Sequence, residues 1–323
     1  MMSAPELEFA DLTDFILRIT ERIWEERHVE DIRKYYTADC RVETPAGITS
    51  NVEAVIQSTL ETLNQFPDRQ LLGEDVIWSE DQPDYFYSSH RIFSTMTHLG
   101  EGNFGKGTGA KIGVRTIADC AVYKNQIYDE WLVRDHAAIL SDIGLPLQEV
   151  ALSLAEARAE SGQKPIHFHS LQNRPKADGV NLSDTDAAQH YLRGYRSLFD
   201  ESAFGWVRAS YDRAAQIYAP GGITLQGWDR ITDFWLGLRA SLGQVKFTAD
   251  HLIHREDPRE PERLALRWTV TGQHEGRGRY GEPRGNPLHL LGISHAELRK
   301  GKILREWVLL DELAIWQQIF SKF

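Results

Sequence analysis

The sequence of 323 residues has little of what three common protein classes require. Its two cysteines, Cys40 and Cys120, are too few for a disulfide framework or a structural zinc site. No apolar run approaches ~20 residues, the length of a membrane-spanning helix, and the opening MMSAPELEFADLTD is acidic, unlike a signal peptide. The 47 acidic and 36 basic residues give a net charge of −11, which disfavours binding to nucleic acid or an anionic membrane. We therefore expect a cytoplasmic protein that binds neither.

What the chain does have is an internal repeat. The pattern His-x-Gly-x-Gly-x-aromatic-Gly-x-x-x-Gly begins at His98 and again at His274, a shift of 176 residues. Without a gap, the same shift maps Glu130-Trp131 onto Glu306-Trp307. Eleven of the thirty-eight positions from 98 to 135 are identical to their counterparts, where chance at ~6% per position gives about two. The chain therefore contains two copies of one unit in tandem.

In each copy, apolar residues recur at helical spacing first, and strand patterns follow. The expected helices are residues 12–24, 29–36, 51–66, 185–198, 206–218 and 228–242, and the clearest strands are residues 76–78, 84–98 and 303–310. Three helices followed by a mostly antiparallel sheet predict an α+β fold. We expect two cone-shaped domains, each with three N-terminal helices packed on a curved sheet and a pocket between the two layers.

The boundary between the copies is expected in a polar, turn-rich segment. SGQKPIHFHSLQNRPKADGVNLSD, residues 161–184, has the composition of a linker. The segment LQEVALSLAEARAE before it predicts a helix that ends the first domain. We therefore place the first domain at 1–160, the linker at 161–183 and the second domain at 184–323.

The motifs resemble a known family. Gly-Lys-Ile-x-x-Glu-Trp-x-x-x-Asp at 301–311, after the His-x-Gly-x-Gly hairpin, is similar to the SnoaL-like polyketide cyclases, and residues 23–47 resemble their entry helices. The first copy departs from the pattern with Asn125-Gln126 in place of Gly-Lys. These cyclases belong to the nuclear-transport-factor-two-like superfamily, with ketosteroid isomerase, scytalone dehydratase and limonene epoxide hydrolase. The resemblance covers both halves and implies the fold, but not the reaction, because the superfamily includes enzymes and non-catalytic binders.

Two glycine-rich segments imitate nucleotide-binding loops. GEGNFG at 100–105 and GRGRYG at 276–281 both match G-x-G-x-x-G, and Gly107 stands where a P-loop needs Ser or Thr. Such loops lead directly into a helix whose N-terminus holds the phosphate, whereas here turn residues and a strand follow. The glycines are better explained by a tight bend between two long strands.

Histidines raise the question of a metal site. His251, His254 and the pair His167 and His169 lack partner carboxylates at the fixed offsets that metal ligation requires. We therefore predict neither a metal nor a cofactor.

The closing hairpin of each copy carries the residues with catalytic chemistry. A three-residue loop, 299–301, with Gly301 in the left-handed region, would pair residue 298 with residue 302. In that register one face carries Leu291, His295, Trp307, Leu309 and Asp311 in the second copy, and Arg115, Asp119, Trp131, Val133 and Asp135 in the first. If this face lines the pocket, each copy has an acid–base site: histidine with aspartate in one, two aspartates with arginine in the other.

Each of these groups also has a structural interpretation. Asp135 and Asp311 precede helical segments and can act as N-caps, although the resemblance implies an acid–base role, since SnoaL-like cyclases use an aspartate in this region. Arg115 with Asp119 can be a rim salt bridge of little energetic value. The histidines at the two hairpin bends can simply hydrogen-bond to the backbone. The two repeated tryptophans most often belong to a core.

We predict a cofactor-independent acid–base enzyme of the cyclase, dehydratase or isomerase type, acting on a small apolar carbonyl or hydroxyl compound. The candidate catalytic residues are Asp119, Asp135, Arg115, His295, Asp311, His98 and His274, and the candidate pocket residues are Trp24, Tyr36, Trp131, Trp206, Tyr218 and Trp307. One alternative is a non-catalytic ligand-binding or assembly module whose two sheets pack face to face within the chain. Another is an epoxide or ester hydrolase that activates a water molecule.

The two copies differ at positions that a ligand would contact. Arg115, His90 and Arg134 of the first copy become Leu291, Leu266 and Leu310 in the second. The copies therefore do not offer the same surface to a ligand. The sequence leaves open the substrate, which of the two pockets is active, and whether the protein forms a homo-oligomer.

Overall fold

The computed structural model describes residues 8–166 and 181–322, so His167 and His169 lie outside the described residues. Its internal contacts divide the chain into two compact units, Met1–Pro146 and Leu147–Phe323. Each unit contains a six-stranded sheet, with strand order β2-β1-β6-β5-β4-β3 in the first and β8-β7-β12-β11-β10-β9 in the second. The identical order confirms the predicted tandem α+β architecture.

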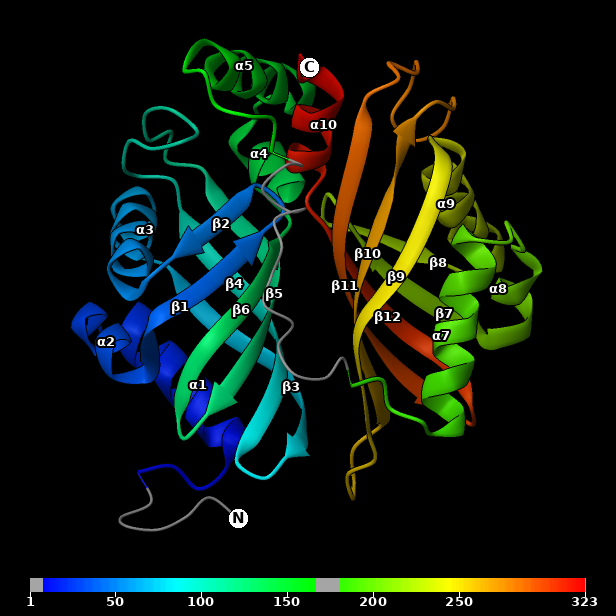
Figure 1. The fold of residues 1–323 in the computed structure, drawn as a ribbon, viewed down its shortest axis with the longest axis horizontal. Coiled ribbons are helices and arrows are strands. Elements are labelled where there is room, and N and C mark those ends of the chain that lie inside the picture. Colours follow the sequence, from blue (N-terminus) through cyan, green and yellow to red (C-terminus); the bar gives the residue numbers. More distant parts are fainter. Residues whose placement is uncertain (1–7, 167–180, 323) are drawn as a thin grey trace. The chain divides into compact units, whose positions relative to one another are not determined.

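The first unit places its N-terminal helices on one face of its sheet (Figure 1). Its elements are α1 (Leu12–Trp24), η1 (Val29–Asp31), α2 (Ile32–Tyr35), β1 (Tyr36–Thr44), β2 (Gly47–Ser50), α3 (Val52–Gln65), β3 (Gln70–Gln82), β4 (Tyr85–Thr97), β5 (Lys111–Tyr123), β6 (Gln126–Arg134) and α4 (His136–Ile143). The Asp11 side chain caps α1 by accepting from the Asp14 backbone N–H at 2.8 Å. Apolar residues at helical spacing, among them Phe15 and Ile19, are buried, as the sequence predicts.

The second unit repeats this plan (Figure 1). Its elements are α5 (Leu147–Glu160), α7 (Asp186–Phe199), α8 (Gly205–Ser210), β7 (Tyr211–Ala219), β8 (Ile223–Gln226), α9 (Trp228–Ala240), β9 (Leu242–Arg255), β10 (Glu262–His274), β11 (Pro287–Arg299), β12 (Lys302–Leu310) and α10 (Glu312–Phe320). Thr185 caps α7, because its hydroxyl accepts a hydrogen bond from the Ala188 N–H at 3.3 Å. Helix α5, which we expected to end the first domain, buries Ala151 and Ala155 and packs on α10, so the boundary falls at Pro146.

The sequence analysis missed one strand pair in each unit. Residues 206–218, predicted as one helix, form the short helix α8 and then strand β7, because apolar residues at 214, 217 and 218 fit either spacing. In the first unit β1 likewise begins directly after α2. Strands β1 and β7 pair in parallel with β6 and β12, and this makes each sheet mixed, although its other pairings are antiparallel.

The closing hairpins do not have the predicted three-residue loop. Arg299 pairs with Lys302, and the two loop residues, Lys300 and Gly301, have φ of 53° and 70°. In the first unit Lys124 and Asn125 have φ of 48° and 59°. Two positive φ values in a two-residue loop identify a type I′ turn, which matches the twist of the strands better. The predicted pairing of residue 298 with residue 302 is therefore wrong.

A β-bulge in each hairpin compensates for the shorter turn. The partner of residue 122 is Ile127 but that of residue 121 is Asp129, so Tyr128 is the extra residue. Leu304 is its counterpart in the second unit. The extra residue shifts the pairing of the two strands by one position. Beyond the bulge, the side chains therefore lie on the same faces as they would with the predicted three-residue loop. Asp119 thus lies opposite Trp131, and His295 opposite Trp307, on shared faces as predicted.

The glycine-rich bends serve the fold. After β4, which ends at Thr97, the chain passes so close to the end of α3 that a Cβ on Gly100 would lie 1.9 Å from the Asn64 carbonyl oxygen. A Cβ on Gly276 would lie equally close, 1.9 Å, to the Ala240 carbonyl oxygen at the end of α9. Neither bend leads into a helix, so the G-x-G-x-x-G matches are turns and close contacts, as expected.

Candidate functional site

The first unit contains a cavity of about 190 Å³ between its helices and its sheet. A buried water molecule needs only ~10–15 Å³ on this measure, so the space fits a small ring compound rather than a few waters. Its apolar wall includes Ile19, Ile23 and Trp24 of α1 together with Leu132 of β6. Its polar lining comprises Tyr36, Thr59, Arg69, His90, Thr116, Cys120, Glu130 and Arg134, among others.

A carboxylic acid lies buried in this cavity. Glu130 of β6 is 8% exposed, and its Oε2 accepts a hydrogen bond from the Tyr36 hydroxyl at 2.8 Å. No residue that the structure describes donates a hydrogen bond to Oε1. Burial raises the pKa of Glu130 from 4.5 to about 7, with the Tyr36 hydrogen bond opposing the shift. At neutral pH this group is therefore present in both its acidic and its basic form.

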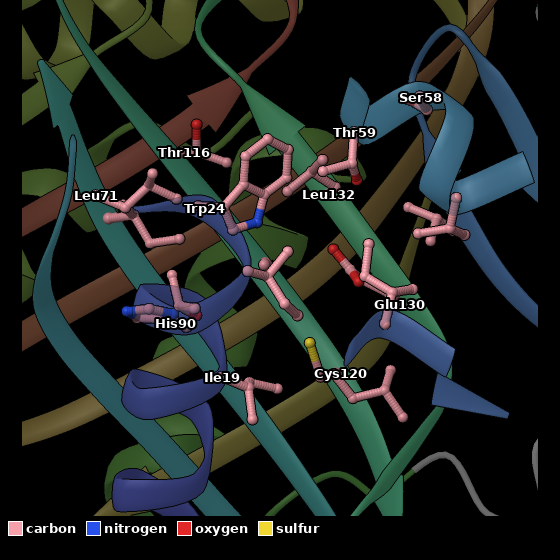
Figure 2. A pocket seen from close by; sticks show the side chains of 18 of the residues that line it. Ile19, Trp24, Ser58, Thr59, Leu71, His90, Thr116, Cys120, Glu130 and Leu132 are labelled. Atoms are coloured by element: carbon pink, nitrogen blue, oxygen red, sulfur yellow. The ribbon is translucent and has the colours of Figure 1, made fainter. Parts of the chain in front are cut away.

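A histidine faces the carboxyl group across the cavity. Figure 2 shows His90 of β4 and Glu130 of β6 on either side of Cys120, which lies on β5, the strand between them. Two strand spacings separate β4 from β6, or about 10 Å, enough for a small ring to lie between the two side chains. Burial, together with the smaller effect of the charge of Arg91, lowers the pKa of His90 to about 4. His90 is therefore neutral at pH 7, with one N–H to donate.

An arginine adds positive charge to the cavity. Arg69, just before β3, is 3% exposed and its guanidinium lies over the Trp24 ring, 4.8 Å from the centroid. Its Nη2 donates to the Ser94 hydroxyl at 3.2 Å, while Nε and Nη1 have no hydrogen-bond partner among the described residues. Burial lowers the pKa of Arg69, and the charge of Arg134 lowers it further. An arginine nevertheless keeps its proton in proteins.

The aspartates predicted for catalysis lie on the other face of this sheet. Neighbouring side chains of a strand alternate between faces, and the cavity is lined by Thr116, Ala118 and Cys120 of β5. Asp119 therefore points away from the cavity, where it is 3% exposed and accepts a hydrogen bond from Ser89. The prediction that this face lines the pocket is wrong, because parity alone does not say which face the helices cover. A catalytic role for Asp119 stays a prediction.

The other residues predicted in the first hairpin have structural roles. Asp135 is the N-cap of α4 and accepts from the Ala138 N–H at 3.1 Å. Arg115 forms an ion pair with Glu74 at 2.9 Å. The His98 ring is buried between the Gln65 amide and the Thr108 hydroxyl, at 3.3 Å and 3.2 Å. None of the three lines the cavity.

The second hairpin gives the same result. His295 is fully buried opposite Trp307 on β12, while Glu306 on the other face of that strand contacts helix α7. Asp311 caps α10, accepting from the Leu313 and Ala314 N–H groups at 3.0 Å and 3.2 Å. His274 is buried, and its ring nitrogens have no hydrogen-bond partner among the described residues.

Two of the six predicted pocket residues, Trp24 and Tyr36, line the cavity. Trp131 lies on the face of Asp119, opposite to it. In the second unit the Trp307 and Tyr218 rings stack at 5.0 Å, and Trp206 packs against Tyr211 at 5.3 Å. The aromatic lining expected for both copies is therefore only partly present.

Aromatic rings occupy the equivalent space in the second unit. Trp268 is the counterpart of Ile92 in the repeat, and Trp235 is the counterpart of Thr59. Both Ile92 and Thr59 line the cavity of the first unit. The Tyr195 ring lies 5.3 Å from Trp235 and 5.6 Å from Trp268. Gly292, the counterpart of Thr116, makes room for Trp268, since a Cβ there would lie 2.3 Å from its ring.

The second unit also has a buried glutamate, although aromatic rings fill the space that corresponds to the cavity. Glu306, the counterpart of Glu130, accepts hydrogen bonds from Tyr191 at 2.5 Å, Tyr195 at 3.0 Å and Tyr211. Burial raises the pKa of Glu306, and these hydrogen bonds oppose the rise. Tyr211 matches Tyr36, because each begins the strand that runs parallel to the closing strand. The glutamate–tyrosine pair is therefore common to both units.

The sequence analysis missed Glu130 and Arg69 as site residues. The sequence does contain a signal for Glu130, because Glu130-Trp131 and Glu306-Trp307 are both part of the repeat. Only the tryptophan of each pair was predicted to line a pocket. A glutamate retained between apolar strand residues predicts a buried acid. Arg69 gave no signal, because it follows a helix in a polar turn and its counterpart is Val245.

Two negative expectations can be compared with the structure. Among the described residues, His254, Glu256 and Glu262 bring ligand atoms within 4.8 Å of one another, but Glu256 is exposed and His254 already pairs with Glu262 at 3.0 Å. We assign no metal to them. No single described helix is long and apolar enough to cross a membrane, and α4 with α5 meets that test only as a pair bent by 113°.

Comparison with known proteins gives a family match for part of the chain. Residues 189–319 match the sequence model of the SnoaL-like polyketide cyclase family. No curated protein matches the sequence.

Similar solved structures each cover under half of this chain. A protein of Jannaschia sp. CCS1 assigned as a SnoaL-like polyketide cyclase is 15% identical over 45% of this chain and 99% of its own, with TM-score 0.38. IdmH of Streptomyces antibioticus, assigned as a polyketide cyclase, is 20% identical over 41% of this chain and 98% of its own, with TM-score 0.36. AclR of Streptomyces galilaeus, assigned as a hydroxylase, is 21% identical over 42% of this chain and 100% of its own, with TM-score 0.37.

The family match lies in the second unit, and the first unit has the same strand order and helix positions. The repeated motifs connect the two at the level of sequence. The second unit therefore matches the SnoaL-like polyketide cyclase family, and the first unit repeats its strand order in tandem.

Proposed function

We propose that the first unit is a cofactor-independent acid–base enzyme of the cyclase or isomerase type, and that Glu130 is its proton-transferring group. The observation that carries this proposal is a buried carboxyl group in a cavity of about 190 Å³. Its pKa of about 7 suits both removal and return of a proton at physiological pH. The apolar wall around it suits a small, flat carbonyl compound.

The proposed step is proton transfer at a carbon next to a carbonyl group. Oε1 of ionised Glu130 takes the proton, and the electrons of the broken C–H bond move onto the carbonyl oxygen to form an enolate. Tyr36 holds Oε2 by its hydrogen bond of 2.8 Å and fixes the direction of the carboxylate. The neutral acid then returns the proton to another carbon. Alternatively, the enolate carbon attacks a second carbonyl to close a ring, and the oxygen of that carbonyl, now an alkoxide, takes the proton from the neutral acid.

The enolate oxygen needs a hydrogen-bond donor on the far side of the ring from Glu130. His90 is neutral, buried and placed there (Figure 2). The Thr116 hydroxyl is also buried in the cavity wall, with no partner among the described residues. A preorganised donor in a water-poor site stabilises developing charge more strongly than one in water.

Deuterium exchange into α-tetralone, a flat ring ketone, tests this proposal. The wild-type protein in D₂O is expected to accelerate exchange at the carbon next to the carbonyl, with a rate that rises as the pH passes through about 7. Glu130→Gln is expected to lower this rate at least ~100-fold. Glu306→Gln is the matched control, because it makes the same change in the filled unit and leaves the rate unchanged.

The opposite results are equally clear. Equal exchange by wild type and Glu130→Gln contradicts the role of Glu130. Binding of α-tetralone without accelerated exchange supports a non-catalytic ligand-binding module instead. The catalytic roles predicted from sequence for Asp119 and His295 are tested in the same assay with Asp119→Asn and His295→Ala, and we expect no loss of exchange beyond that caused by instability.

A further inference from the structure

No acidic side chain among the described residues forms an ion pair with the guanidinium of Arg69. It is 3% exposed, and its neutral partners are the Ser94 hydroxyl at 3.2 Å and the Trp24 ring at 4.8 Å. Its Nε and Nη1 have no hydrogen-bond partner among the described residues. The charged group that acts on it is another cation, Arg134, which lines the same cavity.

Such an arrangement is costly unless a ligand completes it. A buried charge without a partner destabilises a folded protein. Arginine presents its N–H groups in a planar fork that matches the two oxygens of a carboxylate. Two donors of that fork are unused here, next to a cavity large enough for a ring compound. The second unit, whose corresponding space is filled by rings, has Val245 at this position and Val270 in place of Ser94.

We propose that the ligand of the first unit carries a permanent carboxylate, and that Arg69 binds it through Nε and Nη1. This inference rests on the proposed function for the position of the reacting carbon, which lies at Glu130. The ligand is then a flat, singly charged keto acid, with its carboxylate over Trp24 at Arg69 and its carbonyl region between His90 and Glu130. Arg69 thus selects the substrate and orients it, while proton transfer belongs to Glu130.

Cinnamate and its uncharged methyl ester provide the direct test, since they share one flat ring and differ in charge. Isothermal titration calorimetry at pH 7.5 is expected to show wild-type protein binding cinnamate at least tenfold more tightly than methyl cinnamate. Arg69→Met should remove this preference without weakening ester binding. Arg91→Met is the control for loss of a buried arginine, because Arg91 lies outside the cavity lining and its partner Glu74 keeps an ion pair with Arg115 at 2.9 Å. It should keep the preference.

A second measurement does not depend on the affinity for cinnamate. Because the charge of Arg69 is unbalanced, Arg69→Met is expected to unfold at the same temperature as the ligand-free wild type or a higher one. A structural arginine would behave in the opposite way and its loss would lower the melting temperature by several degrees. Sodium benzoate should raise the melting temperature of the wild type and of Arg69→Lys, but not that of Arg69→Met.

Three outcomes would overturn the proposal. These are equal affinity of the wild type for acid and ester, no detectable cinnamate binding at millimolar concentration, and an acid preference that survives Arg69→Met. Equal ground-state affinity with a lower exchange rate in Arg69→Met would make Arg69 a stabiliser of the enolate instead. Glu130→Gln separates the two proposals: it should keep the acid preference, so a failed assignment of Glu130 leaves the assignment of Arg69 standing.

Discussion

The two units share a fold and a buried glutamate–tyrosine pair, yet only one of the two pairs opens onto the cavity described above. Around Glu130 the neighbouring positions hold small or polar side chains, such as Thr59, His90 and Thr116. Around Glu306 the same space holds Trp235, Trp268 and three tyrosines. The shared pair alone therefore does not make a site. A few changes of side-chain volume decide whether a duplicated scaffold binds a ligand or fills its own core.

The comparison also explains how each unit accommodates a buried acid. In the second unit three tyrosine hydroxyls surround Glu306, so the group is satisfied by the protein itself. In the first unit one tyrosine donates to one oxygen of Glu130, and the other oxygen faces the cavity. This incomplete hydrogen bonding is what would leave Glu130 available to the proposed substrate.

Emptying the second unit is expected to have the largest effect on stability. Trp268→Ala removes a fully buried ring that contacts Tyr195 and Phe199, and it should lower the free energy of unfolding by about 3–5 kcal/mol. Chemical denaturation followed by circular dichroism measures this. The new cavity should not prefer cinnamate over its ester, because Val245 stands where Arg69 does in the first unit. A loss below about 1 kcal/mol would show that the rings do not form a tight core.

The pH dependence of stability should distinguish Glu130 from an ordinary surface acid. The folded protein holds the Glu130 proton more tightly than the unfolded chain does, because its pKa is about 7 rather than 4.5. Stability should therefore fall as the pH rises from about 4.5 to beyond 7, by at most about 3.4 kcal/mol. Glu130→Gln should remove this dependence and be more stable than the wild type at about pH 8. The same slope in both proteins would mean that another group titrates.

Filling the first cavity should convert the first unit to the state of the second. Ile92→Trp combined with Thr116→Gly introduces the ring and the space that Trp268 and Gly292 provide in the second unit. We expect cinnamate affinity to fall at least tenfold, or about 1.4 kcal/mol, with stability preserved. Calorimetry and thermal melting measure the two effects. Unchanged affinity would place the ligand outside this cavity.

The smallest effect is expected at the helix caps. Asp135→Ala and Asp311→Ala remove side chains that accept backbone hydrogen bonds at the starts of α4 and α10. Each should lower the free energy of unfolding by about 1 kcal/mol. Exchange into α-tetralone should stay at the wild-type rate in both variants. A loss of exchange in Asp135→Ala alone would restore the catalytic role that the sequence predicted.

The repeat and the order of helices and strands were predictable because their signals are local. Glycine spacing and helical periodicity depend on neighbours in the chain, and residues such as Ile19 in α1 are buried as the pattern predicts. The parallel strands β1 and β7 were missed, because their partners β6 and β12 lie far away in the sequence. Arg69 was unpredictable for a similar reason, since burial in the cavity is set by tertiary contacts.

The face of the closing hairpin shows where sequence reasoning stops. Asp119 and Trp131 share a face, as predicted, although the loop has two residues rather than three. Helices α1 and α3 cover the other face of the sheet. The alternation of side chains along these strands does not predict which face the helices cover. The face-to-face packing of the two sheets and the cytoplasmic location, both expected from the sequence, stay predictions.

The bulge at Tyr128 has a consequence for the tolerance of this hairpin to deletions. If Tyr128 alone were lost, the bulge would disappear and the pairs on either side of it, Val122 with Ile127 and Ala121 with Asp129, would remain. Glu130 would therefore keep its place in the cavity. Loss of Asp129 as well would shift every later residue of β6 by one position, so that Trp131 would enter the cavity and Glu130 would leave it.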